Sequence, residues 1–215
     1  MSSKSLTDLI GWEAVLHGVF AIAVTLLVLD IRVPAAETTP NATALVKALE
    51  DGAPRYVAYV LGFMYIGTYW IATNRTLRLL RGVDHWFLVL GLIYLMVISA
   101  VPFVTSLLAE YIGMDQGRDQ VGIVIFTGWM LIVSIMANVT LQYAARGGRL
   151  LKHGLDQKAL RAWIRLGAVG PLIWILALAI ALLLSATITL ILDALILLLF
   201  LQEVPIGDGE TSNVQ

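Results

Sequence analysis

The chain alternates between long apolar runs and short polar segments, and each apolar run can form one membrane-spanning helix. A helix needs about 20 apolar residues to cross the ~30 Å hydrocarbon layer of a bilayer, and the runs are near that length. Six runs lie at Trp12–Ile31, Tyr56–Ile71, Trp86–Leu108, Val121–Tyr143, Ile164–Leu183 and Ala186–Leu201. The pattern predicts an all-α fold: an integral membrane six-helix bundle in residues 1–203, with a short disordered cytoplasmic tail in residues 204–215.

The last two runs form an almost unbroken apolar stretch, Gly167–Leu201, which is too long for one span. We expect a tight helical hairpin that turns near Ser185–Thr187; a single steeply tilted helix is the alternative. Between the first two runs, we expect a short helix near Ala42–Glu50 in the loop Pro34–Pro54.

The composition fits a lipid environment and excludes several kinds of chemistry. Only 13% of the residues are charged, whereas soluble domains carry about 25%. There is no cysteine, and the three histidines lie far apart in the sequence, so we expect no metal site within one chain. The sequence shows no nucleophile with acid–base partners, so nothing in it indicates an enzyme. No cofactor is expected. The net charge of −1 gives no reason to expect nucleic acid as a partner.

Basic residues lie mostly on one side of the predicted membrane. If the N-terminus is cytoplasmic, the cytoplasmic segments carry Lys4, Arg75, Arg78, Arg81, Arg146, Arg149, Lys152, Lys158, Arg161 and Arg165. The opposite segments carry Arg32, Lys47, Arg55 and Arg118. Because cytoplasmic loops are enriched in Lys and Arg, this bias predicts that both termini are cytoplasmic.

The first run carries a narrow aliphatic stripe when it is plotted at 100° per residue. The stripe contains Gly18, Ile22, Leu26, Leu29 and Val33, with Thr25 on its flank. One interpretation is a packing seam inside the bundle. The other is a pore wall, in which several copies form rings that gate by expelling water, and in which the threonine hydroxyls replace part of an ion's hydration shell. Spacing alone does not choose between them.

Four polar side chains within the runs are further candidates. Histidine changes charge near neutral pH, so His17 is either a pH sensor or a neutral hydrogen-bonded residue. Asp30 either lies in the headgroup layer at the end of the first run, where a carboxylate costs little, or forms a cation-attracting ring at the outer mouth of a pore. Asn138, one turn before Gln142, is expected to form hydrogen bonds between helices rather than a solute site. Asp193 lies deep within an apolar run, where a carboxylate handles ions or protons or makes a structural hydrogen bond.

Three segments resemble one known family. They are Gly18–Pro34 (GVFAIAVTLLVLDIRVP), Tyr69-Trp70, and Val101–Tyr111 (VPFVTSLLAEY). Together they resemble the prokaryotic, single-repeat branch of the transmembrane protein 175 family, the lysosomal potassium channel family. The layout of the whole chain is similar, and the specific motifs lie in its first half.

The resemblance implies a potassium channel of the plasma membrane of a prokaryote. Such a channel conducts K⁺, is a homotetramer of six-span subunits, and has a pore lined by the first helix of each subunit. By position, the residues that face the pore and form its hydrophobic constriction would be Ile22, Thr25, Leu26 and Leu29.

The chain departs from the family pattern at one place. Family members carry an arginine, three residues and then Phe-Ser-Asp ahead of the Gly-Val-Phe stretch, where this chain has Gly11 and Val15–His17. The His-His pair expected after Tyr-Trp is replaced by Thr73-Asn74. In the family these polar groups brace the first helix, so we expect this bracing to be lost on both sides. The departure leaves a small secondary transporter and a non-conducting structural protein as alternative functions.

Overall fold

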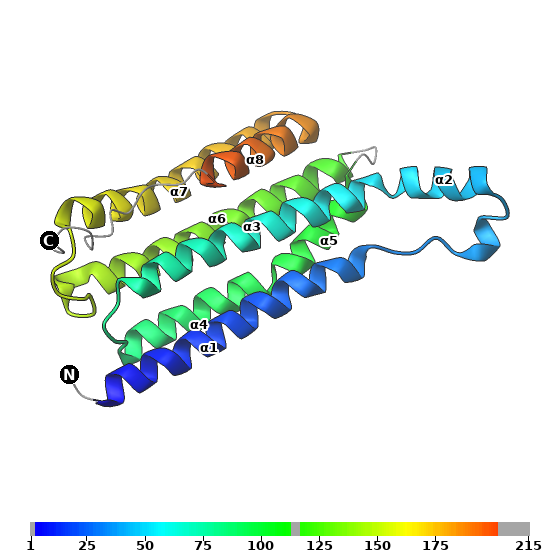
Figure 1. Ribbon diagram of the computed structural model, residues 1–215. Coiled ribbons are helices and arrows are strands. Elements are labelled where there is room, and N and C mark those ends of the chain that lie inside the picture. The colour runs from blue at the N-terminus through cyan, green and yellow to red at the C-terminus, as the bar shows by residue number, and fades with distance from the viewer. Residues whose placement is uncertain (1–2, 113–116, 202–215) are drawn as a thin grey trace, which may run out of the picture.

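The computed structural model describes residues 3–112 and 117–201, which form a bundle of helices (Figure 1). The elements are α1 (Ser3–Leu26), the 3-10 helices η1 (Leu27–Asp30) and η2 (Ala36–Thr38), α2 (Ala42–Asp51), α3 (Ala53–Arg78), α4 (His85–Ser99), α5 (Val101–Tyr111), α6 (Arg118–Ala145), the 3-10 helix η3 (Arg146–Gly148), α7 (Gln157–Leu183) and α8 (Ala186–Leu201). The prediction of an all-α membrane fold is confirmed. The predicted tail, residues 204–215, lies outside the described residues.

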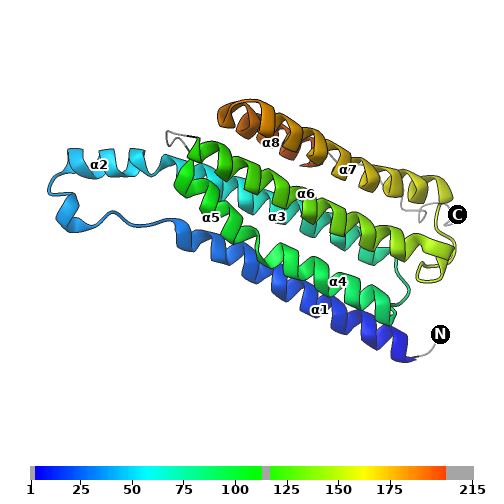
Figure 2. The ribbon, with the colours of Figure 1, turned by 180° about the vertical axis from the view of Figure 1, so that it is seen from behind.

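The helices lie side by side, with α3 and α6 in the middle (Figures 1 and 2). One side of this pair is covered by α1 and α4, and the other by α7 and α8. We call the end of the bundle where α1 begins the first end; it also holds the loops 79–84 and 149–156. The second end holds the turn between α7 and α8, and beyond it α2 extends away from the bundle.

Four helical segments among the described residues are long and apolar enough to cross a membrane: Leu9–Asp30, His85–Tyr111, Arg118–Gly148 and Leu160–Leu183. The tyrosines and threonines of α3 lower its hydropathy, although the helix is 26 residues long. The apolar segment of α8, Ala186–Leu198, is shorter than a standard span. Six crossings therefore remain a prediction for this chain.

Two local predictions about the second end are confirmed. The stretch Gly167–Leu201 is a helical hairpin, because α7 ends at Leu183 and α8 begins at Ala186. The short helix in the first loop is α2, and the side chain of Asn41 caps it by accepting a hydrogen bond from the amide of Ala44, 2.9 Å away. Such a cap satisfies one of the amides that have no partner within the helix.

The third apolar run is broken into two helices. It is interrupted at Ala100, and Pro102 lies in the first turn of α5. Proline has no amide hydrogen to donate, so it fits the first turn of a new helix but not the middle of a long one. The break lets α5 leave the line of α4 and pack against α3 and α6.

One carboxylate at the first end connects α4, α6 and the loop that follows α6. The side chain of Asp84 caps α4 by accepting the amide hydrogen of Phe87 at 2.8 Å. It also accepts the hydroxyl hydrogen of Tyr143 at 3.0 Å and pairs with the guanidinium of Arg149. The start of α4 is thereby fixed to the end of α6.

Candidate functional site

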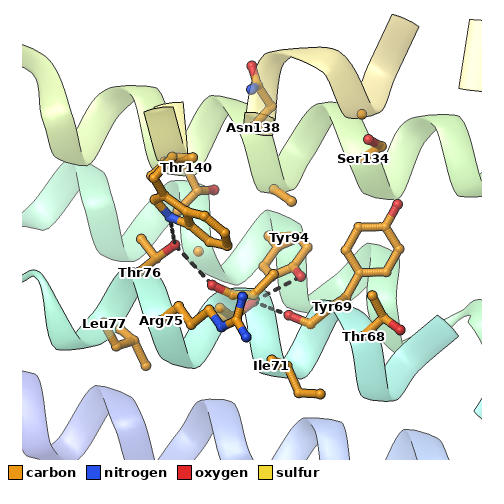
Figure 3. Close-up of a pocket in the computed structure, with 18 of the residues that line it drawn as sticks. Thr68, Tyr69, Ile71, Arg75, Thr76, Leu77, Tyr94, Ser134, Asn138 and Thr140 are labelled. Carbon is orange, nitrogen blue, oxygen red and sulfur yellow. Dashed lines mark hydrogen bonds between the residues drawn. The ribbon is translucent and has the colours of Figure 1, made fainter. Parts of the chain in front are cut away.

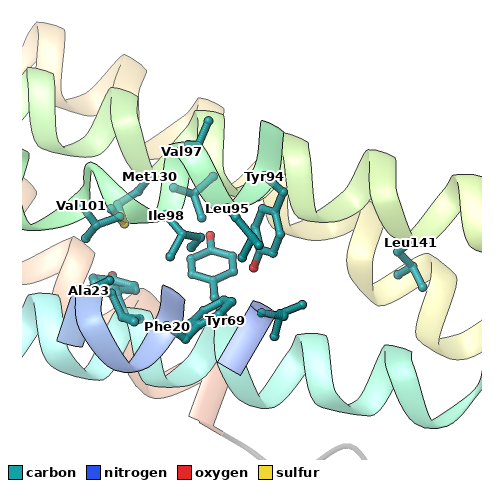
Figure 4. Packing of buried hydrophobic residues seen from close by; sticks show 14 of the residues in the cluster. Phe20, Ala23, Tyr69, Tyr94, Leu95, Val97, Ile98, Val101, Met130 and Leu141 are labelled. Carbon is teal, nitrogen blue, oxygen red and sulfur yellow. The ribbon is translucent and has the colours of Figure 1, made fainter. Parts of the chain in front are cut away.

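One face of the helix α1 is buried against other helices of the same subunit. The buried residues of α1 and the adjoining η1 follow a helical spacing and are at most 8% exposed: Leu9, Trp12, Leu16, Phe20, Ala23 and Leu27. They contact α3, α4 and α5. The ring of Phe20 lies 6.1 Å from that of Tyr94 on α4 (Figure 4). The packing seam of α1 is therefore a different set of residues from the aliphatic stripe seen in the sequence.

One glycine makes this packing possible. The ring of Trp12 lies directly over Gly91 of α4 and meets the ring of Phe87 edge-on, with centroids 6.4 Å apart. A Cβ atom at Gly91 would lie 2.2 Å from Cζ2 of Trp12. Only glycine lets the indole approach the α4 backbone this closely.

The aliphatic stripe lies on the outer face of α1. Within the subunit, Ile22 is 60% exposed, Leu26 is 43% exposed and Leu29 is 72% exposed. The interpretation in which these side chains pack against helices of their own chain is therefore wrong. They face either lipid or another subunit.

The first span changes from an α-helix to a 3-10 helix before its predicted end. The α-helical part ends at Leu26, and residues Leu27–Asp30 form a 3-10 helix with three residues per turn. Leu29 stays on the same face as Leu26, because the two residues are three positions apart and the 3-10 helix has three residues per turn. Val33 lies beyond the helix, so its place in the stripe, which assumed 100° per residue throughout, is corrected.

Thr25 is exposed on the outer face of α1, and its hydroxyl is oriented by the backbone. The hydroxyl donates its hydrogen to the carbonyl of Ile22, with the oxygens 2.9 Å apart. Because the hydroxyl hydrogen points to this carbonyl, a lone pair of the hydroxyl oxygen stays available to a hydrogen-bond donor or a cation.

Asp30 ends the 3-10 helix and is bound to α5. Its carboxylate accepts a hydrogen bond from the hydroxyl of Ser106, and the side chain is partly buried. The Ser106 oxygen also lies 3.0 Å from the carbonyl of Pro102. Sequence analysis did not single out Ser106, although it lies in the motif that carries the family resemblance.

His17 is hydrogen-bonded to a neighbouring helix. Its Nε2 atom lies 2.8 Å from Oδ1 of Asn74 on α3, and its ring centroid lies 6.1 Å from that of Trp70. The expectation that the bracing of α1 is lost on both sides is therefore corrected. The two altered motifs still meet, at His17 and Asn74, through a pair of groups unlike the one the family pattern implies.

Asn138 does not make the interhelical hydrogen bond that we expected. Its Oδ1 accepts a hydrogen from Nε2 of Gln142 at 2.5 Å, within the same helix. Its Nδ2 is buried and has no partner among the described residues.

Asn138 also lines a partly open cavity of about 610 Å³ between α1, α3, α4, α6 and α7 (Figure 3). The contribution of α1 comes from Trp12 and Leu16, on its buried face. The aliphatic stripe does not line this cavity. The two features therefore lie on opposite sides of α1.

Asp193 is fully buried between α3, α6 and α8. One carboxylate oxygen accepts a hydrogen bond from Thr127 at 2.9 Å, while the other has no partner among the described residues. The backbone carbonyl of Asp193 accepts the hydroxyl hydrogen of Tyr65. These contacts agree with the structural interpretation of Asp193, and the cavity described above does not reach it.

These features define a multi-helix membrane protein whose first helix offers an aliphatic face to something outside the subunit. A model of the endosomal/lysosomal potassium channel TMEM175 family matches residues 12–102. A potassium channel of Streptomyces collinus is 34% identical over 201 residues, which cover 93% of this chain and 95% of that protein. A potassium channel of Chamaesiphon minutus is 35% identical over 169 residues, covering 79% of this chain and 82% of that protein.

The fold gives the same result. The crystal structure of a lysosomal potassium-selective channel TMEM175 homolog from Chamaesiphon minutus matches with a TM-score of 0.81 and 29% identity, over 90% of this chain and 96% of that chain. The chain belongs to the TMEM175 potassium channel family. The resemblance found in the sequence is confirmed, and the relatives are channels rather than enzymes.

Proposed function

We propose that this chain is the subunit of a potassium-permeable channel, a homotetramer in which α1 of each subunit lines a central pore. The observation that carries the proposal is the outer face of α1, where Ile22, Leu26 and Leu29 are exposed although the opposite face of the same helix is packed. Membership of a potassium channel family supports the permeant ion. A pore made from one helix per subunit requires a closed ring of subunits.

A row of small residues on the outer face supports close contact of α1 with another subunit. Gly11, Ala14, Gly18, Ala21 and Thr25 recur at intervals of three and four, and all are exposed. No atom lies within 4 Å of a Cβ built at Gly11 or Gly18. Small residues let helices approach closely within a membrane. This row borders the aliphatic stripe, as expected if subunit contact and pore wall share one face.

The proposed gate is a set of aliphatic rings. Around a fourfold axis, Ile22, Leu26 and Leu29 would form stacked apolar rings, which close a pore by expelling water. Thr25 would present a hydroxyl oxygen next to them, and Asp30 would place carboxylates near the second end of the bundle. Conduction then requires the rings to widen.

We assign the first end to the cytoplasm and the protein to the plasma membrane. Arg78, Arg81, Arg149 and Lys152 lie at or next to the loops of that end, and cytoplasmic loops are enriched in basic residues. Bacterial relatives support the choice of membrane.

The experiment is potassium flux in liposomes that contain the purified protein. Ile22→Asn and Leu26→Asn place polar rings in the constriction, so each should let water enter and raise K⁺ flux several-fold over wild type. The matched control is Leu172→Asn, because Leu172 on α7 is 64% exposed and lies outside the proposed pore. Native mass spectrometry should find an assembly of four 23.4 kDa chains.

Equal flux in the wild type and both α1 variants would contradict the gate. A monomer in native mass spectrometry would contradict the pore itself. A conducting tetramer in which Leu172→Asn has the same effect as Ile22→Asn would show that the polar group acts through the lipid-facing surface rather than through a pore.

A further inference from the structure

A basic pocket lies at the first end of the bundle, away from the proposed pore. Its volume is about 480 Å³, and its lining residues are Leu9, Glu13, Leu77, Arg78, Leu80, Arg81, Lys152 and His153. The basic side chains come from the end of α3 and from the two loops of this end, and α1 supplies Leu9 and Glu13. The pocket combines an apolar floor with a basic rim.

Backbone hydrogen bonds hold the two loops together at this pocket. The amide of Arg81 donates to the carbonyl of Leu150, and the amide of Lys152 donates to the carbonyl of Leu79, both at 2.9 Å. They flank an antiparallel bridge between Leu80 and Leu151. The backbone hydrogen bonds therefore fix Arg81 and Lys152 next to each other.

The guanidinium of Arg81 is also held in place. Its Nε and Nη2 atoms donate to the carbonyl of Arg149 at 3.0 and 2.8 Å, and its Nη1 lies 2.6 Å from Nε2 of His153. A carbonyl orients the guanidinium but does not neutralise its charge.

The charge of the pocket is not balanced by carboxylates. The ion pairs found in the described ranges are Arg55–Glu110 and Arg149–Asp84, and neither includes Arg78, Arg81 or Lys152. Among the side chains that the structure describes, Glu13 is the one carboxylate that lines the pocket. The rim therefore keeps a surplus of positive charge, which suits an anion.

We propose that this pocket binds the phosphate of an anionic phospholipid headgroup. Basic pockets at the cytoplasmic ends of membrane helices bind such headgroups. Arg78 and Lys152 would contact the phosphate oxygens, beside the fixed guanidinium of Arg81. The apolar floor of Leu9 and Leu80 would contact the glycerol carbons.

A membrane-borne phosphate suits the site better than a soluble one because of what lies next to it. The partly open, mostly apolar cavity of about 610 Å³ begins one turn deeper along α1, at Trp12 and Leu16, and Leu77 lines both spaces. A charged pocket at the bundle end, followed by an apolar cavity, matches the order of head and acyl chain in a lipid. Because Glu13 belongs to α1, the bound headgroup would touch the proposed pore helix.

The test is lipid retention by the purified protein, measured by native mass spectrometry. The probes are phosphatidylglycerol and phosphatidylcholine with the same acyl chains. Wild type should retain more phosphatidylglycerol, and the double variant Arg78→Gln/Lys152→Gln should lose about tenfold in this preference. These two residues are chosen because the bridge and the Arg81 contacts do not use their side chains. The preference should also fall as salt is raised.

The control is Lys47→Gln/Lys158→Gln, which removes the same charge outside the pocket and should keep the preference. An unchanged preference in the Arg78/Lys152 variant, or an equal loss in the control, would overturn the proposal. Displacement of phosphatidylglycerol by millimolar glycerol phosphate would assign the site to a soluble phosphate instead. The readout is binding, so its failure leaves the proposed channel function untouched.

Discussion

The two faces of α1 are both apolar, but they are under very different constraints. On the inner face, the ring of Trp12 occupies a space that exists only because residue 91 is glycine. On the outer face, a Cβ added at Gly18 would meet nothing within 4 Å in its own subunit. Hydropathy alone therefore cannot tell the faces apart.

The difference shows what specifies a fold in lipid. Lipid tails are as apolar as leucine, so burying an aliphatic side chain between helices gains little hydrophobic free energy. What remains is close van der Waals packing, which is lost when atoms do not meet. The inner face consequently fixes the subunit, while the outer face is left for contacts that one chain cannot make.

The largest effect on stability should come from overfilling the inner face. Gly91→Ala places a methyl group where ring atoms of Trp12 lie 2.2 and 2.7 Å away, so the indole or α1 itself must move. Overpacking typically costs 1–3 kcal/mol, and we expect about 3 kcal/mol here because the ring is rigid. Denaturation in mixed detergent micelles measures the loss.

The control for this substitution is Gly67→Ala in α3, where no atom lies within 4 Å of the new Cβ. It should leave stability unchanged or raise it slightly, because alanine favours a helix over glycine. Equal destabilisation by both substitutions would mean that Trp12 does not occupy the space over Gly91.

A smaller effect should come from emptying the inner face. Phe20→Ala leaves a cavity beside Tyr94, whereas Ile22→Ala shortens a side chain that is 60% exposed within the subunit. In water such a truncation at Phe20 costs about 3–5 kcal/mol; in lipid the transfer contribution is small, so we expect about 1–3 kcal/mol from lost packing. Ile22→Ala should cost the monomer little and change K⁺ flux instead. A large loss of stability from Ile22→Ala, with little loss from Phe20→Ala, would mean that the outer face rather than the inner face packs within the subunit.

The sequence was sufficient for the fold class, the helical hairpin and the short helix α2. These depend on apolar run length and on turn or capping residues such as Asn41, which act locally. The family was also visible in short motifs. The spacing placed Ile22, Leu26 and Leu29 on one face but left open what that face meets, because a helical plot gives which residues share a face and not their surroundings.

Other features depended on contacts between distant segments. The sequence pattern indicates that Asn74 replaces a bracing group without taking over its role, and its pairing with His17 is visible only when α1 and α3 lie side by side. The place of Gly91 under Trp12 has no local signal. The 3-10 helix that begins at Leu27 contacts α3 and α5, and the change of helix type there removes Val33 from the stripe.

The smallest effect on stability should come from breaking the hydrogen bond between His17 on α1 and Asn74 on α3. Oδ1 of Asn74 can only accept, so Nε2 of His17 carries the hydrogen and donates it. Hydrogen bonds between membrane helices average about 0.6 kcal/mol in double-mutant cycles. We expect a coupling of this size between His17→Ala and Asn74→Ala, measured by denaturation in mixed detergent micelles. A coupling near zero would mean that this contact does not hold α1 against α3, whereas a coupling of this size would make it a brace that holds α1 while its outer face moves.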